Sequence, residues 1–302
     1  MPRLNVNGGA IDDTFAEAFG MRATALVVTA PNRKWARQAA VSMTGFATSV
    51  IGCGCEAAID VELPPSETPD GRPGCRVMIF AVSTDELQKQ LQNRVGQCVL
   101  TSPGSACFAG LDGPNELKLG SALRYFGDGW QISKKLGGRH FWRVPVMDGE
   151  FVCEATVGMT KGAVGGGNLL LLAGSNARAL AAAEAAVAAI DEVRGAIMPF
   201  PGGIVRSGSK IGGKYKGMTA STNDAFAPTL RGVTKSELEA GVNAVLEIVI
   251  DGETSDAVVS AMRAGIKAVT GLGPDKGASR ISAGNYGGKL GKFHYHLREL
   301  LP

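Results

Sequence analysis

The residue best placed to do chemistry is Glu247, a lone carboxylate inside the apolar segment 244–250, AVLEIVI. Alternation along a strand puts it on the face of Val245 and Val249, in a strand that is otherwise apolar, so burial is expected. Burial disfavours the ionised form and raises the pKa of a carboxyl group. Such a group takes up and returns a proton near neutral pH, as acyl transfer between two amines requires. An edge strand with Glu247 in water, or a buried ion pair, is the competing interpretation.

Three loops that combine glycine with small hydroxyls, amides and aromatics are the candidate binding segments. Backbone N–H groups in such loops face ligands, and aromatic rings stack on flat substrates. The same composition also serves tight turns at a lobe or subunit interface. The predicted substrate-binding residues are Phe200, Pro201, Gly202, Gly203, Ser221, Thr222, Asn223, Asp224, Asn285, Gly287, Gly288 and Lys289.

A basic stretch lies among these loops and consists of Arg206, Lys210, Lys214 and Lys216. It would suit a polyanionic substrate tail, and it is equally compatible with an ordinary solvated surface. The segment 208–214, GSKIGGK, matches G-x-x-x-x-G-K, but a phosphate loop continues with Ser or Thr and a helix, which this chain lacks. Nucleotide binding is therefore not predicted.

Metal and triad chemistry have little support in the sequence. A lone C-x-C and the H-x-H of KFHYHL bring too few ligands together, so no metal site is predicted. Three histidines do not define a Ser-His-Asp arrangement with any specificity. Neither metal-dependent chemistry nor a nucleophile triad is therefore predicted.

Composition narrows the class of protein. The 302 residues suit one large domain or two of about 150. A net charge of +3 is too small to indicate a nucleic-acid partner. No apolar run is long enough to span a membrane, and the N-terminal residues do not resemble a signal peptide. Six scattered cysteines are then expected as reduced thiols, and the protein is expected in the cytoplasm.

One pattern, a short apolar strand followed by a helix and a small-residue stretch, recurs four times and would position these loops. The strands are predicted at 23–30, 76–82, 168–174 and 244–250, each followed by a helix. Two pairs of such units indicate an internal duplication. The predicted fold is α+β, with two similar split-βαβ (ferredoxin-like) lobes, 1–147 and 148–302, whose helices cover mixed sheets. A single irregular α/β sheet is the alternative.

Several long blocks of the sequence are similar to those of a known family. The chain resembles formylmethanofuran:tetrahydromethanopterin formyltransferase over essentially its whole length. The blocks are DTFAEAF, TGFATSVI, TPDGRPG, GQCV, FGDG, PFPGGIV, STNDA, EIVI and ISAGNYGGKLG.

The resemblance implies two lobes of split-βαβ type and a homo-oligomer, usually a tetramer, with a cleft close to a subunit interface. It implies no prosthetic group or metal, and small-molecule C1 carriers as cosubstrates: a tetrahydromethanopterin-type pterin and a methanofuran-type carrier. The formyl group moves between N5 of the pterin and the carrier amine. The catalytic glutamate of the family falls in the EIVI block, at Glu247.

Charge favours one branch of the family. Archaeal members tend to be strongly acidic, whereas this chain carries +3, so it is similar to the bacterial branch of methylotrophs. That branch implies a subunit of a formyltransferase/hydrolase complex with metal-dependent hydrolase partners, in the oxidation of formaldehyde to formate. A catalytically silent scaffold subunit is the alternative, and a hydrolase acting on the same carrier is a weaker one. The presence of Glu247 and the glycine loops favours the enzyme.

Overall fold

The protein is described by a computed structural model that covers residues 2–301. Its contacts separate two compact units: unit 1 is Met1–Gly20 with Val164–Pro302, and unit 2 is Met21–Ala163. Two long strands, β3 (Phe15–Thr29) and β11 (Thr156–Ala173), each contribute residues to both units. The units therefore do not begin and end at the predicted lobe boundary, and the lobes 1–147 and 148–302 stay a prediction.

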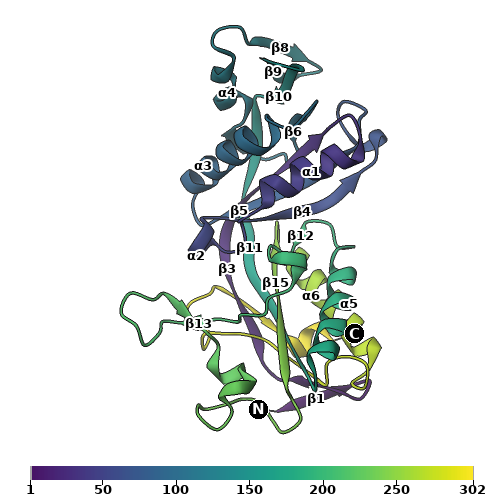
Figure 1. Ribbon diagram of the computed structural model, residues 1–302, viewed down its shortest axis with the longest axis vertical. Helices are drawn as coiled ribbons and strands as arrows, with labels where there is room; N and C mark the ends of the chain where they lie inside the picture. The colour runs from purple at the N-terminus through teal and green to yellow at the C-terminus, as the bar shows by residue number, and fades with distance from the viewer. Residues whose placement is uncertain (1, 302) are drawn as a thin grey trace. The chain divides into compact units, whose positions relative to one another are not determined.

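Runs of two to four consecutive strands are separated by helices along residues 2–301 (Figure 1). The helices are α1 (Arg33–Thr44), α2 (Val50–Cys53), α3 (Thr84–Arg94), α4 (Gly120–Leu123), α5 (Asn176–Ile190) and α6 (Ser255–Leu272). The other strands are β1 (Arg3–Val6), β2 (Gly9–Asp12), β4 (Glu56–Leu63), β5 (Gly74–Ala81), β6 (Ala106–Ala109), β7 (Asn115–Lys118), β8 (Ile132–Leu136), β9 (Arg139–Val146), β10 (Gly149–Glu154), β12 (Ala196–Ile197), β13 (Lys210–Ile211), β14 (Ala220–Ser221), β15 (Ala244–Gly252), β16 (Arg280–Ser282) and β17 (Phe293–His296).

The same βαββαβ arrangement is present in both units. In unit 2 the strands pair in the order β6-β3-β5-β4, with α1 and α3 as the crossover helices. In unit 1 the order is β16-β11-β15-β12, with α5 and α6 in the same roles. All of these pairs are antiparallel. The predicted duplicated split-βαβ fold is thereby confirmed.

Helix starts follow the capping signals in the sequence. The hydroxyl of Ser83 accepts the N–H of Glu86 at 3.1 Å, and Ser175 and Thr254 cap α5 and α6 in the same way. The buried face of α5 is mostly alanine, which lets the helix lie close to its neighbours. On α6, a Cβ at Gly265 would lie 3.0 Å from a Leu169 methyl group. Small residues therefore set the spacing of this helical layer.

The two hydrophobic cores differ in composition. The core of unit 1 lies between α5 and α6 and one face of its sheet, and includes Leu169, Leu171, Ile248 and Ile250. The core of unit 2 packs α1 and α3 against β3 and β5 and contains fewer alanines, together with the buried cysteines Cys55, Cys75, Cys107 and Cys153. Additional strands extend each sheet: β2 pairs parallel to β16 in unit 1, and β10 pairs parallel to β6 in unit 2. In unit 1, these additions lengthen the sheet face that carries the site described below.

Gly158 of unit 2 offers a test of this packing. A Cβ there would lie 2.5 Å from the carbonyl oxygen of Leu111 and 2.7 Å from the N of Gly113, both backbone atoms. We expect Gly158→Ala to lower the free energy of unfolding by about 1–3 kcal/mol, because overpacking moves backbone. Gly52→Ala is the control, since a Cβ there meets nothing within 4 Å. Thermal unfolding at equal protein concentration measures both, and equal midpoints would show that the 111–113 loop moves freely.

Candidate active site

Glu247 occupies the centre of β15, held from both sides. In β11 it lies opposite Leu170. On its other side, the N–H of Val205 donates to the Glu247 carbonyl at 2.8 Å, and the Glu247 N–H donates back at 2.9 Å. β15 is therefore an inner strand at this point, and the edge-strand interpretation is wrong.

The side chain of Glu247 lies on the sheet face opposite α5 and α6. Its neighbour Ile248 belongs to the core beneath those helices, so alternation places Glu247 and its partner Leu170 on the other face. There the carboxylate is half-buried. Burial raises the pKa of Glu247 to about 7. The group therefore exchanges a proton at neutral pH, as predicted for a buried carboxylate in this strand.

A cavity of about 290 Å³ in unit 1 opens onto this face. Its walls come from three sources: the polar face of the sheet, the 209–237 segment, and the loop after β16. The lining residues are Asp12, Thr14, Asn168, Leu170, Ser209, Lys210, Asn223, Ala225, Phe226, Glu237, Glu247, Arg280, Ser282, Ala283, Gly284, Asn285 and Tyr286. Glu247 shares the cavity with amides, hydroxyls and two aromatic rings, a lining that suits a flat polar ligand.

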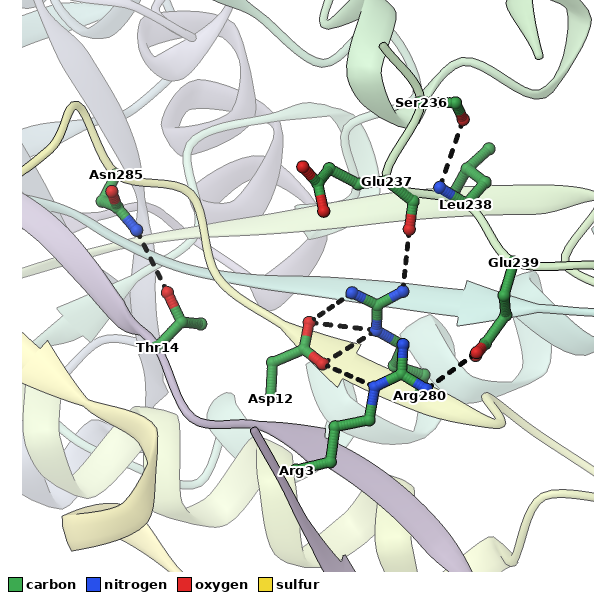
Figure 2. Close-up of polar contacts among 9 residues, drawn as sticks. All are labelled: Arg3, Asp12, Thr14, Ser236, Glu237, Leu238, Glu239, Arg280 and Asn285. Atoms are coloured by element: carbon green, nitrogen blue, oxygen red, sulfur yellow. Dashed lines mark hydrogen bonds and ion pairs between the residues drawn. The ribbon is translucent and has the colours of Figure 1, made fainter. Parts of the chain in front are cut away.

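A buried ion pair forms one wall of the cavity (Figure 2). The guanidinium of Arg280 donates to Asp12 through Nη2 at 2.7 Å and through Nε at 2.9 Å, and both residues are at most 3% exposed. Nη1 of Arg280 donates to the carbonyl of Glu237 at 2.9 Å. Arg3 pairs with Asp12 at 3.3 Å and with Glu239 at 2.7 Å. The network ties β2 and β16 to the 237–239 segment.

The loop after β16 carries the predicted residues Asn285, Gly287, Gly288 and Lys289. Asn285 lines the cavity, and its amide donates to the hydroxyl of Thr14 at 3.1 Å. Both glycines have left-handed φ angles, +76° and +70°, which glycine adopts without strain. The side chain of Lys289 is exposed.

The STNDA segment follows the small β13–β14 hairpin. Asn223 lines the cavity, whereas Ser221, Thr222 and Asp224 are not among its lining residues. Asp224 accepts from Nζ of Lys210 at 2.6 Å, and this hydrogen bond lowers the pKa of Asp224. Lys210 lines the cavity itself, so the ion pair fixes the cavity rim. The hydroxyl of Ser221 is buried and has no hydrogen-bond partner within residues 2–301.

The PFPGGI turn is placed beside the cavity strand rather than in the cavity lining. Phe200, Pro201, Gly202 and Gly203 precede the bridge from Val205 to Glu247. Gly203 is buried with φ +76°, and a Cβ there would lie 2.9 Å from a methyl group of Val187. The turn therefore packs onto α5 and directs the chain along β15. A role for its residues in binding stays a prediction.

The basic stretch is exposed along its length. Arg206, Lys210, Lys214 and Lys216 all have solvent-accessible side chains, and the last two lie in the loop between β13 and β14.

The described part of the chain contains no cluster of three or more His, Cys, Asp or Glu side chains that could hold a metal ion. Among residues 2–301, no helix is both long and apolar enough to cross a membrane.

Comparison with known proteins gives the family. The family model described as formylmethanofuran-tetrahydromethanopterin formyltransferase matches residues 4–146, and the model described as its proximal lobe matches residues 149–300. The chain belongs to this family. The resemblance predicted from the sequence blocks is confirmed.

Family relatives are similar over the full chain. A formylmethanofuran–tetrahydromethanopterin formyltransferase from Methylococcus capsulatus is 62% identical, covering 98% of this chain and 99% of the relative. A protein of Methylorubrum extorquens that is named as one subunit of the formyltransferase/hydrolase complex is 57% identical, covering 100% of this chain and 98% of the relative.

Two solved structures of the family have the same fold. The formyltransferase/hydrolase complex from Methylorubrum extorquens, solved with methylofuran, contains a chain that matches with a TM-score of 0.98 at 56% identity, covering 100% of this chain and 99% of that one. The formyltransferase from Methanosarcina barkeri matches with a TM-score of 0.93 at 45% identity, covering 98% and 100%.

Sequence reasoning missed much of the cavity wall of this family member. The residues concerned are Asp12, Thr14, Asn168, Phe226, Glu237, Arg280, Ser282 and Tyr286. Most stand in strands or loops far apart in sequence, and only the pairing of β2, β16 and β11 collects them. A polar residue recurring in strands that are otherwise apolar, such as Asn168 before LLLL, was the available signal.

The buried ion pair predicts a large stability loss. Arg280→Gln leaves the fully buried carboxylate of Asp12 without its main partner, so we expect the free energy of unfolding to fall by about 3–5 kcal/mol. Arg298→Gln is the matched control: it removes a pair with Asp13 in which the Arg298 side chain is 57% exposed, a loss of at most about 1 kcal/mol. Denaturant unfolding distinguishes them, and equal losses would contradict the assignment.

Proposed function

We propose that this chain is an N-formyltransferase that moves a formyl group between N5 of a tetrahydromethanopterin-type pterin and the amine of a methanofuran-type carrier. The proposal rests on Glu247, because burial raises the pKa of this carboxyl group to about 7. Glu247 also lies in a cavity whose size and lining suit a flat polar ring. Membership of the family, with relatives that carry this name, supports the proposal.

The chemistry follows from amide exchange. The carrier amine attacks the formyl carbon on N5, and a tetrahedral intermediate forms with both nitrogens attached. The attacking nitrogen must lose a proton and N5 must gain one before the bond between carbon and N5 breaks. Glu247 accepts the first proton and returns one to N5. No covalent enzyme intermediate is needed, because two substrates bound side by side gain from orientation alone.

The pKa of Glu247 is the property that suits it to this role. An ordinary glutamate, with a pKa of about 4.3, would hold a proton too weakly to return it to a leaving nitrogen at neutral pH. With a pKa of about 7, both protonation states are populated, so one group acts as base and then as acid.

The proposed binding surface combines predicted residues with residues that the sequence analysis missed. Asn223 and Asn285 line the cavity with Glu247 and are proposed to hydrogen-bond the polar ring edges. Phe226 and Tyr286 supply aromatic faces in the same wall. Ser221, with its buried unpaired hydroxyl, is proposed as a further hydrogen-bond donor to ligand.

For its assembly we propose a homotetramer that associates with metal-dependent hydrolase subunits in the cytoplasm. A relative named as a subunit of a formyltransferase/hydrolase complex supports the association, and six unbridged cysteines support a reducing compartment. In that setting formyl passes from pterin to furan carrier and is released as formate. The silent-scaffold alternative leaves the cavity and the proton-exchanging Glu247 unexplained.

Glu247→Gln tests the reaction. The amide keeps the shape but exchanges no proton, so we expect kcat to fall by about 10²–10⁴, with both KM values within a few-fold. Ultraviolet absorbance of the pterin follows the reaction between formyl-pterin and furan carrier. The wild-type rate profile should inflect near pH 7, and this inflection should be absent from the variant. Retention of more than about a tenth of the rate would assign proton transfer to solvent or another residue.

The same variant tests the raised pKa through stability. Between about pH 4.3 and 7 the folded protein binds more protons at Glu247 than the unfolded chain does. The free energy of unfolding therefore falls as pH rises through this window, by on the order of 1–3 kcal/mol. Glu247→Gln should lack that decline and be the more stable protein above pH 7. Parallel curves for both proteins would mean that Glu247 is solvated.

The basic stretch is tested by charge removal. If it meets a carboxylate-rich tail, the double variant Lys214→Gln, Lys216→Gln should raise KM for the furan carrier a few-fold and leave the pterin KM alone, because each exposed pair is worth about 0.2–1 kcal/mol. The effect should shrink as salt rises. The control is Lys134→Gln with Lys135→Gln, which removes the same charge from the exposed strand β8. Equal effects of the two pairs would identify ordinary surface.

A further inference from the structure

A second buried carboxylate, Glu17, lies in unit 1 outside the proton-transfer chemistry. It stands in β3 within FAEAF and is 1% exposed. Its partners are backbone amides of the loop after β16, about 270 residues away in sequence. Burying a charge is costly unless it is fully hydrogen-bonded, so this arrangement needs an explanation.

Four N–H groups of one loop converge on the Glu17 carboxylate. Oε2 accepts from Tyr286 at 2.6 Å and from Gly288 at 2.8 Å. Oε1 accepts from Leu290 and Gly291, each at 2.7 Å. These bonds stabilise the ionised form and lower the pKa of Glu17 to about 2, against the desolvation that burial imposes. The carboxylate is thus charged throughout the working pH range.

Glycines at three positions allow the loop to approach Glu17 this closely. The left-handed φ angles of Gly287 and Gly288 turn successive N–H groups toward one side. Gly291 approaches the strand so closely that a Cβ would lie 2.5 Å from the carbonyl oxygen of Ala18. At the start of the loop, Asn285 donates to the carbonyl of Phe15 at 3.2 Å. The loop is therefore wrapped around residues 15–18.

This loop forms the cavity wall next to Glu247. Asn285 and Tyr286 line the same cavity as Glu247. Tyr286 is 37% exposed, so its ring lies at the solvent side of this wall. Its pKa is raised by partial burial and, further, by the negative charges of Glu247 and Glu17. The other charged side chains in this wall are Asp12, Lys210, Glu237 and Arg280.

We propose that Glu17 is a positioning residue, which acts by holding the 285–291 loop in place so that Tyr286 shields Glu247 from water. This inference rests on the proposed formyl transfer. An amide cannot replace the carboxylate, because its NH2 group would face two of the four N–H donors. Loss of the loop position would hydrate Glu247 and spoil the placement of both substrates.

The test uses two variants that displace the loop by different means. Glu17→Gln removes the charge. Gly291→Ala keeps the charge but displaces the loop, because its Cβ would lie 2.5 Å from the carbonyl oxygen of Ala18 and 2.8 Å from Cγ of Glu17. Steady-state kinetics with formyl-pterin and furan carrier are measured from pH 5 to 9. For both variants we expect kcat to fall about tenfold to a hundredfold, and the inflection near pH 7 to move down by one pH unit or more.

Glu184→Gln is the control, because Glu184 is an exposed carboxylate on α5, across the sheet from the cavity. It should keep the wild-type rate and inflection. An unmoved inflection in either loop variant, with wild type active, would overturn the positioning role; should Glu17→Gln fail to fold, Gly291→Ala decides alone. Inactivity of the wild type together with Glu184→Gln would instead reject formyl transfer itself.

Discussion

The protonation of each carboxylate at this site is set by its exposure to water and by the number of hydrogen-bond donors around it. Glu247 and Glu17 belong to the same unit, yet their pKa values are about 7 and about 2. Desolvation dominates at Glu247, whereas four backbone N–H groups outweigh it at Glu17. The two carboxylates therefore differ at neutral pH: both protonation states of Glu247 are populated, whereas Glu17 stays charged and hydrogen-bonded to the loop.

The pairing of strands in unit 1 determines which side chains lie on the cavity face of the sheet. On one face, β11 and β15 bury alternate apolar side chains beneath α5 and α6. The other face carries polar groups beside a smaller apolar cluster that includes Leu170 and Leu172. That face gains Asp12 and Arg280 only because β2 and β16 lie side by side in parallel. Their ion pair neutralises what would otherwise be a second buried negative charge near Glu247, so removing either partner would leave an uncompensated charge in the cavity wall.

Local patterns were enough to predict the fold and the raised pKa of Glu247, but not the cavity wall. Strand runs and caps such as Ser83 are local signals, and they predicted the duplicated topology. Glu247 could be recognised because its own strand is apolar. Glu17 likewise is a lone carboxylate among apolar residues in FAEAF. Its low pKa, however, depends on backbone amides of the 285–291 loop, which the pairing of β17 with β3 brings close to it. Such partners are set by tertiary structure and have no trace in a window of sequence.

The duplicated units hold different side chains at the same strand position. Arg76 in β5 and Glu247 in β15 precede the N-caps of the following helices, Ser83 and Thr254, by the same number of residues. In unit 2 that position holds a cation, which pairs with the buried Asp60 at 2.5 Å beside an apolar cluster. A charge neutralised in this way is a structural element. In unit 1 the position holds a carboxylate facing a cavity, so its charge is left to depend on pH and ligand.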